Sequence, residues 1–143
     1  MRHLTHRPPS SATVGRVVAT GIALTALHFA DNTFNIEDYP APGWQPDRFE
    51  FAVAAFWIVF SAVGVLGYRS YRDGDFSRAH PLLAFYALTG LISLGHFSTA
   101  SPGDLTTFGL ITVLVDAVAG CAVLGVVIWS VGSRRADLGR PVA

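Results

Sequence analysis

Cysteine and charged residues are scarce in this sequence. Its single cysteine, Cys121, cannot form an internal disulfide bond, and no CxxC pair suggests a zinc or redox motif. Charged residues make up 14% of the chain, against about 25% in a typical soluble domain. Ten basic residues balance ten acidic ones, so no overall positive field attracts nucleic acid. A glycine-rich phosphate loop is also missing, so neither nucleic acid nor a nucleotide is an expected partner.

Apolar residues, in contrast, account for 51% of the chain, and its mean hydropathy is +0.43. A helix needs about 20 apolar residues to cross a bilayer, and four segments approach that length. They cover residues 12–34, 51–68, 80–100 and 102–131. Apolar and polar residues do not alternate with a period of two, as they would in a membrane barrel. We therefore predict an all-α, polytopic membrane protein, with four transmembrane helices in one antiparallel bundle and no β-sheet.

The charged residues of the connecting segments predict the orientation of a single domain over residues 1–143. Arginines cluster in both tails (1–11 and 132–143), at the start of the first helix, and in the loop 69–79: Arg2, Arg7, Arg16, Arg69, Arg72, Arg78, Arg134, Arg135 and Arg140. The loop 35–50 is acidic. Because arginine-rich segments stay in the cytoplasm, we expect both termini there, in a bacterial-type inner (plasma) membrane. A cleaved signal peptide is the alternative for the first segment, although HFA before Asp31 is a poor cleavage site.

Five polar residues stand out inside or at the end of the apolar segments: His28, Asp31, Asn32, His96 and Asp116. An ionisable side chain at the centre of a membrane helix costs about 2.5–3.5 kcal/mol, so such groups usually face inward and find partners. Asp116 lies about 20 Å along its helix, near the midplane. Both histidines lie one to two turns below the outer surface. We expect these side chains to form an interior polar site in the outer half of the bundle.

Each of these residues also has a purely structural interpretation. Asn32 could end the first helix in the left-handed conformation. A buried neutral histidine could simply bond a neighbouring hydroxyl group. Asp31 lies near a helix C-terminus, where the helix dipole disfavours a negative charge, so it calls for a partner such as an imidazolium or a metal ion.

Three functional interpretations remain open at this level. The favoured one is a small accessory, structural or sensor subunit that contacts the lipid bilayer and either another membrane protein or a second copy of itself. The second is a transition-metal or haem protein, in which His28 and His96 are ligands and Asp31 is a further metal ligand. The third is a proton-coupled membrane enzyme or transporter centred on Asp116. No catalytic residue can be assigned, and an enzyme is the less favoured class.

Overall fold

The computed structural model describes residues 7–39 and 49–138, and within these ranges every regular element is a helix. The described residues form four long helices, α1 to α4, and three short 3₁₀ helices: η1 lies between α1 and α2 in the sequence, and η2 and η3 lie between α3 and α4. Their bounds are α1 Ser11–Phe34, η1 Ile36–Asp38, α2 Phe49–Arg72, α3 Phe76–Ile92, η2 Ser93–Ser98, η3 Pro102–Asp104 and α4 Thr107–Leu138. The predicted all-α class is confirmed.

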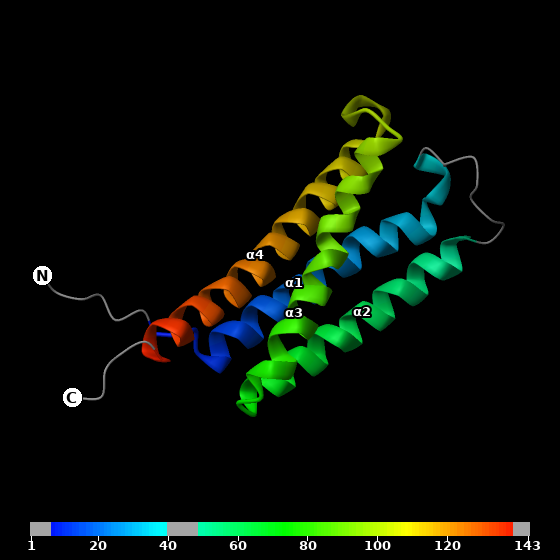
Figure 1. Ribbon diagram of the computed structural model, residues 1–143. Coiled ribbons are helices and arrows are strands. Elements are labelled where there is room, and N and C mark those ends of the chain that lie inside the picture. Colours follow the sequence, from blue (N-terminus) through cyan, green and yellow to red (C-terminus); the bar gives the residue numbers. More distant parts are fainter. Residues whose placement is uncertain (1–6, 40–48, 139–143) are drawn as a thin grey trace, which may run out of the picture.

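The four long helices form an antiparallel bundle. Helices α1 and α3 each pack against both α2 and α4. The start of α1 and the end of α4 lie at one end of the bundle with the α2–α3 turn, and the short 3₁₀ helices lie at the opposite end (Figure 1). Four helical segments are long and apolar enough to cross a membrane: Ser11–Phe34, Phe51–Arg72, Phe76–Ser98 and Thr107–Ala136. The chain is a multi-pass membrane protein.

The second helix is longer than its apolar segment, which corrects the predicted end at residue 68. Helix α2 continues to Arg72, and a turn with Gly74 at φ 81° leads into α3. The hydropathy pattern marks only the part of a helix that suits hydrocarbon, whereas backbone hydrogen bonding continues into the interface. Packing also holds this last turn of α2, because Tyr71 is buried and its hydroxyl donates a hydrogen bond to the carbonyl oxygen of Pro9 (2.8 Å). The predicted loop 69–79 is therefore much shorter.

The predicted start of the fourth helix at residue 102 is wrong. The backbone N–H of Ser101 donates to the Asp104 carboxylate (2.8 Å), but this capping interaction starts only the short helix η3. Leu105 is extended and separates η3 from α4. Helix α4 begins at Thr107, because the Thr106 hydroxyl accepts a hydrogen bond from the backbone N–H of Gly109 (3.0 Å) and caps it instead. Its end is also later than predicted, at Leu138 rather than residue 131.

The last residues of the third predicted segment, 80–100, form the 3₁₀ helix η2 rather than a continuous α-helix. Two hydroxyl groups donate hydrogen bonds to backbone carbonyl oxygens in this segment. Ser98 donates to Gly95 (2.6 Å), and Ser93 donates to Val113 of α4 (3.2 Å). Such side-chain bonds compete with the regular helical ladder. The tighter winding of η2 determines where His96 points.

Two apolar clusters lie toward opposite ends of the bundle, and Asp31 and His96 contact the one at the 3₁₀ end through Tyr39. The cluster toward the termini includes Val14, Val18, Leu83, Tyr86 and Val123. The smaller one, at the 3₁₀ end, consists of the buried side chains Tyr39, Ala100, Leu105 and Val113. The predicted polar site is therefore part of the bundle interior.

Candidate functional site

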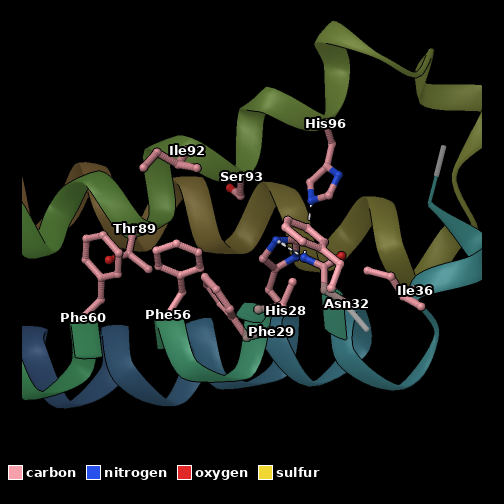
Figure 2. A pocket seen from close by; sticks show the side chains of 12 residues that line it. His28, Phe29, Asn32, Ile36, Phe56, Phe60, Thr89, Ile92, Ser93 and His96 are labelled. Atoms are coloured by element: carbon pink, nitrogen blue, oxygen red, sulfur yellow. Dashed lines mark hydrogen bonds between the residues drawn. The ribbon is translucent and has the colours of Figure 1, made fainter. Parts of the chain in front are cut away.

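Three of the five predicted residues, His28, Asn32 and His96, are joined by hydrogen bonds. His28 and Asn32 lie one turn apart on α1, and His96 comes from η2. The Asn32 amide nitrogen is 2.9 Å from His28 Nε2 and 3.3 Å from His96 Nε2 (Figure 2). The two imidazole rings meet edge to face, with centroids 5.4 Å apart. We call these three side chains the His–Asn–His cluster. Asn32 lies inside α1, so it does not end that helix.

The amide group of Asn32 determines how the two rings are protonated. An amide nitrogen only donates, so both Nε2 atoms accept, and in the neutral rings both Nδ1 atoms carry the hydrogen. His28 Nδ1 then faces the Thr112 hydroxyl in a long contact of 3.5 Å. Thr112 is free to accept, because its own hydrogen goes to the Gly109 carbonyl oxygen (2.9 Å). For His96 Nδ1–H, the described part of the chain supplies no hydrogen-bond acceptor.

Asp31 is buried beside the cluster but is bound by other groups. The Tyr39 hydroxyl donates to Asp31 Oδ2, and the Asn35 amide donates to Asp31 Oδ1 (2.7 Å). A phenol and an amide thus take the place of the predicted imidazolium or metal partner. Burial, followed by the hydrogen bond to Asp31, raises the pKa of Tyr39 above its usual value.

The fold is expected to lose stability at high pH through Tyr39. Below about pH 10, the ordinary pKa of tyrosine, both folded and unfolded chains keep the phenolic proton, and stability is independent of this group. Above it the unfolded chain releases the proton first, so the free energy of unfolding falls as pH rises. Thermal unfolding in detergent should show this decline in the native protein. Tyr39→Phe should show a weaker decline and, at neutral pH, a loss of about 1–3 kcal/mol for the missing bond to Asp31. An unchanged pH profile would contradict the assignment.

Asp116 is separate from the cluster. Its side chain is fully buried (0% exposed), and neither carboxylate oxygen has a hydrogen-bond partner among the described residues. It lies one helical turn from Thr112, which contacts His28. No hydrogen bond within the described ranges connects Asp116 to the cluster.

A cavity of about 300 Å³ opens beside the cluster, between α1, α2 and α3. Its wall is mainly aromatic and aliphatic, and Figure 2 shows the His–Asn–His cluster at one end and Phe60 and Thr89 at the other. The lining residues are His28, Phe29, Asn32, Ile36, Phe49, Val53, Phe56, Phe60, Thr89, Ile92, Ser93 and His96. Sequence reasoning missed this cavity, because its phenylalanines look the same as any lipid-facing residue.

The cluster is poorly suited to bind a metal ion. Both Nε2 lone pairs accept hydrogen bonds from Asn32, and both Nδ1 atoms carry a hydrogen, so neither ring offers a free lone pair. Within residues 7–39 and 49–138 no three His, Cys, Asp or Glu side chains converge in a way that could hold a metal ion. The geometry therefore adds no support to the metal and haem hypotheses.

Comparison of the chain with protein-family models, with curated proteins and with solved structures finds no match. The inference of function rests on the cluster and the cavity.

Proposed function

We propose that this protein is a small accessory or sensor subunit that binds a lipophilic molecule in the cavity between α1, α2 and α3. One observation carries the proposal: an apolar cavity of about 300 Å³ has a hydrogen-bonded polar cluster at one end. Small-molecule sites have this design, with mostly hydrophobic walls and a few fixed polar groups, and they start at about this volume.

The rim of the cavity supports a ligand that arrives from the membrane. Phe56 on α2 and Ile92 on α3 line the cavity and are nevertheless 54% and 65% exposed, so the cavity is open at these residues. Both lie in segments long and apolar enough to span the bilayer. A molecule dissolved in the hydrocarbon layer can therefore reach the cavity without passing through water.

The chemistry of the cluster favours binding over catalysis. A general base needs a free lone pair near neutral pH, and both Nε2 atoms of the cluster already accept hydrogen bonds. Thr112 donates its hydrogen to a backbone carbonyl oxygen, so it is not positioned as an activated nucleophile. A rigid pair of rings is better suited to hold a ligand than to exchange protons with it.

The proposed location is a bacterial-type inner membrane, with both termini in the cytoplasm. Arginines gather at the end of the bundle where α1 begins and α4 ends: Arg7, Arg16, Arg69, Arg72, Arg78, Arg134 and Arg135. Asp31, Glu37, Asp38 and Asp104 lie toward the opposite end. This distribution supports the orientation through the positive-inside rule. The outward face of α2 is apolar and would contact lipid, another membrane protein or a second copy of the chain.

Filling the cavity tests the proposal. Val53 lines the cavity and is 8% exposed, whereas Val59 on the same helix is 58% exposed and is not part of the lining. We expect Val53→Trp to exclude the ligand and Val59→Trp to leave it in place. The measurement is mass spectrometry of the lipophilic molecules extracted from each protein after purification in mild detergent. The same set of molecules in the native protein and in both variants would contradict the proposal.

A second candidate is a proton-coupled enzyme or transporter centred on Asp116. The observation in its favour is that both carboxylate oxygens are buried without a partner among the described residues. If this protein moves protons, Asp116→Asn should abolish pH-driven proton flux into liposomes, while Asp104→Asn, at an exposed position in η3, should preserve it. Equal flux with all three proteins, or no flux above that of empty liposomes, would remove this candidate.

A further inference from the structure

The polar end of the cavity also indicates what kind of molecule it selects. We infer that the ligand is a neutral lipophile with a hydrogen-bond-accepting oxygen (a hydroxyl, ether or carbonyl group), and that His96 Nδ1–H binds this oxygen. This inference rests on the proposed function and adds to it the chemistry of the ligand's polar group.

Asn32 sets the tautomer of His96. Asn32 donates one amide hydrogen to each imidazole, so His96 uses Nε2 as an acceptor and keeps its hydrogen on Nδ1. In His28, the equivalent Nδ1–H faces the Thr112 hydroxyl oxygen as its acceptor. His96 is the half-buried member of the cluster, and its Nδ1–H has no acceptor within the described ranges. His96 lines the cavity, so a ligand oxygen beside it would supply the acceptor that the described residues do not.

The walls of the cavity favour a neutral ligand. Among the described residues that line it there is no arginine and no acidic residue. A charged head group would lose its hydration on entering and would find no opposite charge to compensate. An oxygen without a formal charge needs only the single donor that His96 offers.

The side chains that line the cavity indicate the nature of the ligand's apolar part. Phe29, Phe56 and Phe60 supply flat apolar surfaces along the cavity (Figure 2). The Ser93 hydroxyl donates to a backbone carbonyl oxygen. The Thr89 hydroxyl oxygen has no partner among the described residues, but it is covered by neighbouring atoms, so neither side chain offers the ligand a strong polar contact. A branched or unsaturated chain with one terminal oxygen, such as a prenyl alcohol, matches this arrangement.

The test uses two probes added to the whole protein in phosphatidylcholine nanodiscs: farnesol, and its dehydration product farnesene, which keeps the branched unsaturated C15 chain but has no oxygen. The ¹³C-methyl signals of Val53 and Ile92 report occupancy of the cavity, and the ¹⁵N signals of histidine report the hydrogen bond. We expect farnesol to bind about tenfold more tightly than farnesene, the value of one hydrogen bond in an apolar site. Only farnesol should shift His96 Nδ1–H. His96→Phe should remove the difference between the probes, and His80→Gln, at the other end of the bundle, should keep it.

The outcomes separate the inference from the proposed function. Equal binding of the two probes to the native protein overturns the inference but leaves a lipophile-binding cavity. Failure of both probes to shift the cavity methyl signals overturns the proposed function itself. A His96 ring with its hydrogen on Nε2 in the native protein also overturns the inference, and this measurement does not depend on whether His96→Phe folds.

Discussion

Gly90→Ala is expected to break the packing of α3 against α4 and to cost more stability than a glycine-to-alanine change at any other described position. A Cβ atom at Gly90 would lie 2.2 Å from the carbonyl oxygen of Asp116 and 2.9 Å from the backbone nitrogen of Gly120. Both contacts are with backbone, which cannot rotate away as a side chain can. Overpacking usually costs 1–3 kcal/mol, and a clash with two backbone atoms should reach about 3 kcal/mol or more.

The measurement is the free energy of unfolding in mixed micelles, together with the yield of folded protein from membranes. Gly125→Ala on α4 is the matched control, because no atom of the described residues, apart from the adjoining helix backbone, lies within 4 Å of the added Cβ. Alanine has the higher helix propensity, so the control should be as stable as the native protein or slightly more stable. If Gly90→Ala and Gly125→Ala behaved alike, the close crossing of α3 and α4 would be disproved.

Asn32→Leu is expected to have the second largest effect, because it removes the central member of the His–Asn–His cluster. Leucine is similar in size to asparagine but donates no hydrogen bond, so His28 Nε2 and His96 Nε2 both lose their donor. An unsatisfied buried group costs about 1–3 kcal/mol, and His28 is almost fully buried. We expect a loss of about 2–4 kcal/mol in the free energy of unfolding.

Thr33→Val is the control for this variant. Thr33 lies on the same turn of α1, and its hydroxyl bonds only the carbonyl oxygen of Phe29 (2.7 Å). Its loss should change stability by less than about 0.5 kcal/mol. The native Asn32 amide holds both His28 and His96 in the tautomer with hydrogen on Nδ1. Without it, histidine ¹⁵N spectra of Asn32→Leu should show both tautomers of each ring. Native-like stability and a native-like tautomer pattern in Asn32→Leu would show that the cluster does not organise the site.

The sequence predicted the candidate site residues better than it predicted their partners. His28 and His96 were expected to lie at similar depth, and the structure brings their rings together. The bridging role of Asn32 was not foreseen, because the spacing of His28 and Asn32 along a helix says nothing about a third group from η2. Asp31 was expected to need a cation or imidazolium, and it bonds Tyr39 and Asn35 instead. Those partners follow it in the chain and depend on how the chain folds back after α1.

The helical class, the four apolar spans and the charge difference between the two ends follow from the sequence alone. Each depends on the length of an apolar run or on a count of charges, and these quantities do not change when helices rotate or shift. The η2 winding, the Gly90–Gly120 crossing and the cavity depend on the tertiary structure. They depend on which face each helix turns to its neighbours, and a difference of one residue in register would carry His96 away from Asn32. Side-chain contacts across helices are a property of packing, so only the folded bundle could decide which polar groups meet.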